Sequence, residues 1–242
     1  MYLVDHVLIL LLFVVQPVWG AIEARRIEAR CRAGQRLDRI RFYSQTVLLE
    51  CTFLAVLFTA WFALDRTVAD LGVVAPGGAG FWTGTVLLVA FTGLLAYQWR
   101  SATKASDEEK AQLAESFGKL EQYMPHNTRE LNGFYGVSIV AGIVEEIVYR
   151  GFVLWYLAQF MPLWVAVAVS SVAFGLGHSY QGPSGALRTG LVGLAFGIFY
   201  VTTGSIWLPI IAHILLDALQ GGTVHEILRK DDDSLDPKLS PE

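Results

Sequence analysis

Long apolar runs separated by short polar connections dominate this chain. Several of them reach the length of about 20 residues that a helix needs to cross the hydrocarbon core of a bilayer. The pattern therefore predicts an all-α, polytopic membrane helix bundle with about seven transmembrane helices. The predicted helices cover residues 3–20, 44–64, 81–99, 134–160, 163–178, 186–203 and 205–220.

The composition supports a membrane protein, because 54% of the residues are hydrophobic and the mean hydropathy is +0.46. A soluble domain of this length is rarely so apolar. The first apolar run has no basic segment before it and no small-x-small cleavage site after it, so we expect a retained helix rather than a signal peptide. Asp5 and His6, at its start, are expected to be interfacial residues without a catalytic role.

A basic stretch, residues 25–41, follows the first predicted helix and carries seven arginines against three acidic residues. Such a stretch is also found in nucleic-acid-binding proteins, but between two hydrophobic spans it fits a cytoplasmic loop that obeys the positive-inside rule. We therefore expect the lipid bilayer, and no nucleic acid, as a partner. The two cysteines, Cys31 and Cys51, are too few for a disulfide framework or a cysteine metal site.

Three regions are predicted along the chain. Residues 1–133 form N-terminal transmembrane helices with the basic loop and an interfacial helical segment over 105–123, for which Ser106 is a plausible N-cap. Residues 134–220 form a helical core that contains most of the intramembrane polar groups. Residues 221–242 are acidic and polar toward their end and are predicted to be a disordered cytoplasmic tail.

The span 134–160 contains three ionisable side chains, Glu145, Glu146 and Arg150. Each costs about 2.5–3.5 kcal/mol near the bilayer centre on insertion scales, so the chain must pair them or use them. Glu146 and Arg150 have the i,i+4 spacing of an ion pair and are predicted to support the structure. Glu145, about 100° around the helix, is left facing the bundle interior, where an unpaired carboxylate is suited to general acid–base catalysis.

Two further spans contribute polar groups: His178 at the end of one, and His213 with Asp217 at i,i+4 on another. A rise of about 1.5 Å per residue puts Glu145 and His213 near the same depth, with His178 and Asp217 nearer the cytoplasmic boundary. We therefore predict that these groups converge in one site. A buried histidine can also serve only as an interhelical hydrogen bonder, and that alternative stays open for both histidines. His126, His225 and Glu226 are expected to be ordinary surface residues.

Three motifs in this order, Glu-Glu-x-x-x-Arg at 145–150, Phe-x-x-x-His at 174–178 and His-x-x-x-Asp at 213–217, resemble the CPBP family. These are the CaaX-prenyl-protease and bacteriocin-processing intramembrane proteases, also called the Abi family. The resemblance covers residues 134–220 and implies a four-helix catalytic core.

The resemblance implies a role for each motif residue. Glu145 would activate water with the help of His178, and Glu146 with Arg150 would support the structure. His213 and Asp217 would stabilise an oxyanion, although many relatives carry Asn in place of Asp217. No metal is predicted, yet two histidines and a glutamate are also a donor set for zinc, so zinc stays open as an alternative.

The hypothesis is an intramembrane endopeptidase that uses glutamate-activated water in a bacterial inner (plasma) membrane. Its substrate is expected to be a membrane-associated protein or peptide: a prenylated C-terminal peptide, a leader peptide or a C-terminal sorting tail. One alternative is a proton-coupled transporter, which also places acids and histidines in spans. The other is a non-catalytic membrane adaptor or immunity protein on the same scaffold.

Overall fold

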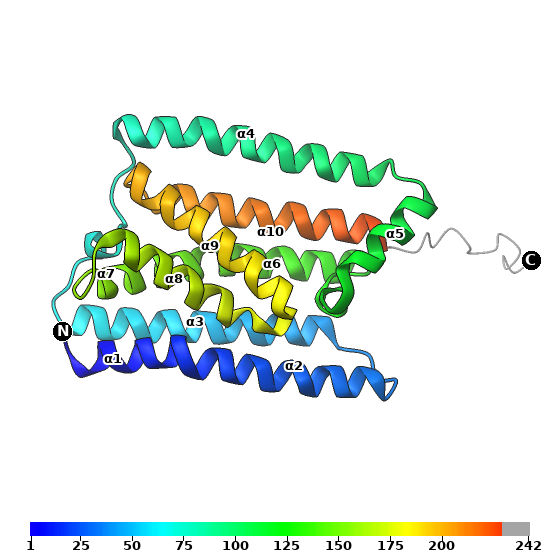
Figure 1. The fold of residues 1–242 in the computed structure, drawn as a ribbon, viewed down its shortest axis with the longest axis horizontal. Coiled ribbons are helices and arrows are strands. Elements are labelled where there is room, and N and C mark those ends of the chain that lie inside the picture. Colours follow the sequence, from blue (N-terminus) through cyan, green and yellow to red (C-terminus); the bar gives the residue numbers. More distant parts are fainter. Residues whose placement is uncertain (229–242) are drawn as a thin grey trace, which may run out of the picture.

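The computed structural model describes residues 1–228, the side chain of Lys119 excepted. Every regular element in this part of the chain is a helix, which confirms the predicted fold class. The long helices lie roughly along one axis and form a bundle (Figure 1). They are α3 (Arg39–Ala63), α4 (Gly78–Thr103), α6 (Thr128–Glu146), α8 (Leu163–Gly177), α9 (Pro183–Thr203) and α10 (Trp207–Leu228), with a shorter α5 (Asp107–Phe117) at one end.

Two rods are interrupted by π-helical turns but not by loops. The first consists of α1 (Leu3–Leu10), the π-turn η1 (Leu11–Val15) and α2 (Gln16–Arg32). In the second, α6 continues directly into the π-turn η4 (Ile147–Val153) and then α7 (Leu154–Leu157). Short 3₁₀ segments are η2 (Val68–Leu71), η3 (Gly118–Tyr123) and η5 (Ser179–Gln181).

Side-chain caps fix the starts of three helices. The Ser106 hydroxyl accepts a hydrogen bond from the backbone N–H of Glu109, whose carboxylate accepts from the backbone N–H of Ser106, so α5 begins with a capping box. This confirms Ser106 as the predicted N-cap. Asp38 caps α3 and Asn127 caps α6 in the same manner, each accepting from a backbone N–H three residues later. These caps satisfy backbone donors that have no partner inside the helix.

All seven predicted spans are helical, and five helices are long and apolar enough to cross a membrane: Leu3–Arg32, Arg39–Ala63, Gly78–Thr103, Pro183–Thr203 and Trp207–Leu228. The α6–η4–α7 rod contains the three charges noted above. The apolar helix α8 has 15 residues and is about 22 Å long, which is short of a core of about 30 Å. The integral, multi-pass character of the chain is clear, while the count of seven spans stays a prediction.

The predicted basic loop is much shorter than expected. The first rod runs from Leu3 to Arg32 and α3 begins at Arg39, so six of the seven arginines lie on helix and only residues 33–38 connect the two. Thirty residues give a helix of about 45 Å, which exceeds the bilayer core, so its arginine-rich end extends beyond the hydrocarbon. Similarly, α10 continues to Leu228, so residues 221–228 of the predicted tail are helical. The rest of that tail, 229–242, lies outside the described residues.

The α6–η4–α7 rod lies at the centre of the bundle, between α3 and α10, while α4 packs on the outer side of α10 (Figure 1). A core of buried side chains forms where α3, η4 and α8 meet, and it includes Leu57, Trp61, Phe152 and Val167. The outer faces of α3 and α4 expose large apolar side chains instead. Such apolar faces are expected where a helix contacts lipid, and half of the α10 window is buried inside the protein.

Close contact between α8 and α9 depends on glycine. A Cβ atom added at Gly193 would lie 2.9 Å from the Phe174 ring, and one at Gly197 would lie 2.9 Å from Val167. Both contacts are too short for a side chain, so small residues set the distance between the two helices. This packing brings the C-terminal end of α8, where His178 lies, toward the centre of the bundle.

Three residues expected at the surface or interface are less exposed than predicted. His225 on α10 is buried, and His126 is half-buried against Arg39. Asp5 is only 1% exposed, because its carboxylate accepts two hydrogen bonds of 2.7 Å from the guanidinium of Arg66. That guanidinium also lies over the rings of Trp61 and Trp155 at 4.8 and 4.5 Å. The cluster therefore ties α1 to the ends of α3 and α7.

Replacing Asp5 with Asn should lower the free energy of unfolding by about 2–3 kcal/mol, less than for a fully buried pair because Arg66 is 12% exposed. Asn keeps the shape but removes the charge that neutralises Arg66. Thermal unfolding in detergent measures the effect. Asp65→Asn, at the exposed neighbour of Arg66, is the matched control and should leave the unfolding temperature unchanged. Equal behaviour of the two variants would contradict the role of the Asp5–Arg66 pair.

Candidate active site

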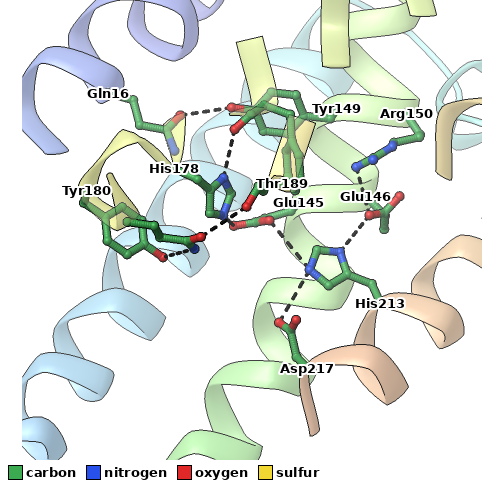
Figure 2. Close-up of polar contacts among 12 residues, drawn as sticks. Gln16, Glu145, Glu146, Tyr149, Arg150, His178, Tyr180, Thr189, His213 and Asp217 are labelled. Atoms are coloured by element: carbon green, nitrogen blue, oxygen red, sulfur yellow. Dashed lines mark hydrogen bonds and ion pairs between the residues drawn. The ribbon is translucent and has the colours of Figure 1, made fainter. Parts of the chain in front are cut away.

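Four elements supply the polar residues at the centre of the bundle (Figure 2). Glu145 and Glu146 end α6, and Arg150 lies in the π-turn η4 that follows directly. His178 caps the C-terminus of α8, and His213 lies in the first part of α10. π-Turns within α-helices often mark functional sites, because the extra residue changes where the following side chains point.

Glu146 and Arg150 form a buried ion pair, which confirms the predicted pairing. Arg150 Nη1 donates to Glu146 Oε1 at 2.9 Å, and the side chains are 2% and 0% exposed, respectively. Arg150 Nη2 donates to the carbonyl oxygen of Gly193 on α9 at 2.9 Å, and its guanidinium lies 4.8 Å from the centre of the Phe174 ring. Arg150 thus joins η4, α8 and α9 while it neutralises Glu146.

Glu146 has a second partner that its sequence spacing does not reveal. Its Oε1 atom lies 2.7 Å from Nδ1 of His213 on α10. A carboxylate ionised by its pairing with Arg150 can only accept, so His213 Nδ1 carries the hydrogen. Glu146 therefore orients His213 as well as supporting the fold. The Nε2 atom of His213 is left facing Glu145 Oε2 at 3.8 Å and Asp217 Oδ2 at 3.5 Å.

His178 is oriented by the backbone of its own helix. Its Nδ1 atom lies 2.9 Å from the carbonyl oxygen of Phe174, which can only accept, so Nδ1 carries the hydrogen. The other nitrogen, Nε2, then bears a lone pair in the neutral ring. It faces Glu145 Oε1 at 3.8 Å.

Glu145 lies between the two imidazole rings, with one carboxylate oxygen toward each (Figure 2). Both separations of 3.8 Å are too long for direct hydrogen bonds but suit a bridging water. No described residue hydrogen-bonds to the buried Glu145 Oε2. The side chain is 15% exposed, His178 is 14% exposed and Asp217 is 32% exposed, so water can reach the site. The structure thus brings together Glu145, His178, His213 and Asp217.

One carboxylate near this group was missed in the sequence. Glu50 on α3 has a buried Oε2 atom, and the charges of Glu145, His213 and Asp217 act on its carboxyl group. The sequence could have indicated Glu50, because it is the single carboxylate in the predicted span 44–64. An ionisable residue within a span is a candidate for function by default.

The donor set does not have the arrangement of a metal site. Zinc bonds of about 2.0–2.2 Å place tetrahedral ligands about 3.4 Å from each other. The nitrogens of His178 and His213 are each 3.8 Å from a different oxygen of Glu145, which is wider than that spacing. Among the described residues, no group of three or more His, Cys, Asp or Glu side chains is placed to hold a metal ion. Chelation tests directly whether a zinc ion takes part.

The comparisons with known proteins concern the same region. Residues 128–219 match the model of a family described as "Rce1-like: Type II CAAX prenyl endopeptidase Rce1-like". The resemblance to the CPBP family is confirmed. We call residues 128–219 the CPBP segment. It runs from α6 to α10 and contains all the site residues named above except Glu50.

A relative in Bacillus subtilis (strain 168) bears the name "Putative membrane peptidase YdiL". It is 34% identical to this chain over 80 residues, which are 33% of this chain and 32% of that protein. The matched region therefore spans about a third of the relative's length. No solved structure matches this chain. The family likeness thus concerns the CPBP segment, and helices α1–α4 lie outside it.

Proposed function

We propose that this protein is an intramembrane protease that hydrolyses a peptide bond in a membrane-associated protein or peptide. The observation that carries the proposal is the position of Glu145, whose two oxygens each lie 3.8 Å from a histidine Nε2 atom. A water that hydrogen-bonds to both the carboxylate and the imidazole lone pair would lie beside the line that joins the two atoms. The CPBP segment and the name of the Bacillus relative support the same class of activity.

In the proposed mechanism a water bridges Glu145 and His178. Glu145 takes a proton from that water as the oxygen attacks the scissile carbonyl carbon, and His178 holds the water through its Nε2 lone pair. Glutamate-activated water needs no metal in this scheme. An apolar bundle favours such chemistry, because fixed donors and acceptors act more strongly where bulk water is excluded.

His213 is proposed to stabilise the oxyanion that forms on the carbonyl oxygen. With Nδ1–H donated to Glu146, a second proton on Nε2 makes the ring a cation that donates into the site. The neighbouring carboxylates of Glu145 and Asp217 favour that cation. Asp217 thus supports the charge of His213 and does not itself need to donate a hydrogen bond.

Asp217→Asn should keep cleavage within about tenfold of the wild type, because an amide oxygen in the same place still turns a partial negative charge toward His213 Nε2. Asp217→Leu should lower the rate by about 10–100-fold, the cost of one hydrogen bond to a charged group. Initial rates of peptide cleavage in proteoliposomes measure both. Equal rates for the Asn and Leu variants would contradict the role of Asp217 toward His213.

The function is tested with the full-length protein in liposomes and three probes: a farnesylated C-terminal peptide, a leader-type peptide and a peptide with a hydrophobic C-terminal tail. Mass spectrometry of the products should detect cleavage of at least one probe. Chelators should leave that cleavage unchanged. Loss of activity on chelation with recovery on addition of zinc would replace the glutamate–water mechanism by a zinc mechanism.

The alternatives give different results in the same liposomes. A proton-coupled transporter would change the internal pH without forming any peptide product, and an adaptor would bind a partner whether or not Glu145 is present. The location we propose is a bacterial inner membrane, in line with the multi-pass fold and with the bacterial relative.

A further inference from the structure

Glu50 lies on a helix outside the CPBP segment, and its place relative to the site follows from the packing of α3 along α6. The rings of Tyr43 and Phe134 are 5.7 Å apart, and those of Trp61 and Phe152 are 6.3 Å apart. The differences 134 − 43 and 152 − 61 are both 91, so the register is constant along the two helices. The same offset puts Glu50 level with residue 141, one helical turn before Glu145.

On its other side α6 packs against α10, and the contacts between these two helices show which residues of α10 lie at the depth of Glu145. Gly142 on α6 is in contact with Ile214, and Gly221 on α10 is in contact with Phe134. Ile214 lies directly after His213 and three residues before Asp217. Glu50 therefore lies at the depth of the site, and the charges of Glu145, His213 and Asp217 act on it.

Two of these neighbours, Glu145 and Asp217, are acids like Glu50, and the third, His213, already faces the carboxylates of Glu145, Glu146 and Asp217. The Oε2 atom of Glu50 is buried and receives no hydrogen bond from any described residue. The guanidinium of Arg150 donates its hydrogen bonds to Glu146 and to the carbonyl oxygen of Gly193. A carboxylate with a buried oxygen and no cation of its own is disfavoured beside two other carboxylates, whereas a carboxylic acid is neutral and carries a proton that it can donate.

The proposed hydrolysis needs such a proton. When the tetrahedral intermediate collapses, the nitrogen of the scissile bond must be protonated, because an amide anion is too poor a leaving group. Glu145 faces the two imidazole rings, on the side where the water is activated. Glu50 comes from α3, a separate helix, and its half-buried side chain has one buried oxygen, Oε2.

We propose that Glu50 is the general acid of this site, which rests on the proteolytic function proposed above. Glu145 takes one proton from water, and the hydroxide forms a bond to the carbonyl carbon. The carbon–nitrogen bond then breaks with its electron pair on nitrogen, and Glu50 gives its proton to that nitrogen. The proton on Glu145 returns to Glu50 through water, so the net reaction is peptide plus water to acid plus amine.

The test compares two substrates that share one acyl part and differ in the leaving group. One is the peptide that the wild type cleaves, and the other is the matching 4-nitrophenyl ester, whose leaving group departs without protonation. Glu50→Gln should lower peptide cleavage by about 100-fold and ester cleavage by less than about threefold. Thr52→Val, on the same helix at an exposed position, is the control and should cleave both substrates normally.

Glu145→Gln in the same assay separates this proposal from the function on which it rests. This variant should cleave neither the peptide nor the ester, because both reactions need activated water. Unchanged cleavage of both by Glu145→Gln would overturn the proposed function, and normal peptide cleavage by Glu50→Gln would overturn only the role of Glu50. Equal loss of peptide and ester by Glu50→Gln would also overturn it, since a structural role affects both alike.

Glu50→Asp covers the case in which the Gln variant does not fold. It keeps an acid on a shorter side chain, so its peptide-to-ester rate ratio should fall between those of the wild type and of a variant without an acid. A wild-type ratio with both rates lowered would overturn the proposal, since a structural role affects both alike. Thermal unfolding in detergent shows which variants are folded.

Discussion

Glu145→Gln should lower peptide cleavage by about 10²–10⁴-fold, the usual contribution of a general base. The amide cannot take a proton from water, while its shape fits the same space between the rings of His178 and His213. The fold should not suffer, because no described residue hydrogen-bonds to Glu145 Oε2 and removal of a charge from the bundle interior relieves a desolvation cost. Cleavage rates and thermal unfolding temperatures measured on the same preparation check both statements.

The adjacent residue is the natural comparison. Glu146→Gln should lower the stability, since it breaks the contacts to Arg150 and His213, whereas Glu145→Gln should not. Glu145 would then have a role in catalysis, and Glu146 a role in stabilising the site. Loss of stability in the Glu145 variant, or retained cleavage at the wild-type rate, would contradict this division.

Arg150→Met should lower the free energy of unfolding by about 3–5 kcal/mol, the usual cost of removing one partner of a buried ion pair. Methionine fills part of the space but leaves Glu146 fully buried without its cation. It also removes the hydrogen bond to the Gly193 carbonyl that ties η4 to α9. Denaturant unfolding in detergent micelles measures the effect.

Two variants complete this experiment. Arg188→Met removes an exposed arginine from α9 and should leave the stability unchanged. The double variant Glu146→Gln with Arg150→Met should be less destabilised than the sum of the single variants, because neither charge is then left alone. Additive effects would show that the two residues act independently, contrary to the geometry.

The hydrophobic runs were sufficient to predict every long helix, because a span must satisfy its backbone internally and bear apolar side chains toward lipid. Helix ends were less predictable. The first helix continues through its arginines to Arg32, since arginine is a good helix former and the end of this rod lies beyond the hydrocarbon. Likewise α10 extends to Leu228 although its last turns are less apolar.

The i,i+4 spacing of Glu146 and Arg150 predicted their pairing because local helix geometry alone determines it. The contact between Glu146 and His213 was not predictable, since it depends on how α6 packs against α10. Glu50 was missed for a similar reason. One acid in an apolar run has no spacing pattern, and its neighbours are known only once the register of α3 and α6 is known.

Asp5 shows the same limit at the other end of the bundle. Its partner Arg66 lies 61 residues away, and the two aromatic rings that cover the guanidinium come from different helices. Contacts within one helix turn can therefore be predicted from spacing, whereas the partners that make a buried charge tolerable usually lie on another helix. The structure supplies those partners.

The most direct measurement compares protein termini in membranes of cells that produce the wild type or Glu145→Gln at equal levels. Mass spectrometry of the isolated membranes identifies new termini near hydrophobic segments. If Glu145 activates water for peptide hydrolysis, a defined set of termini will be present with the wild type and absent with the variant. Identical sets of termini in the two membranes would contradict the proteolytic function.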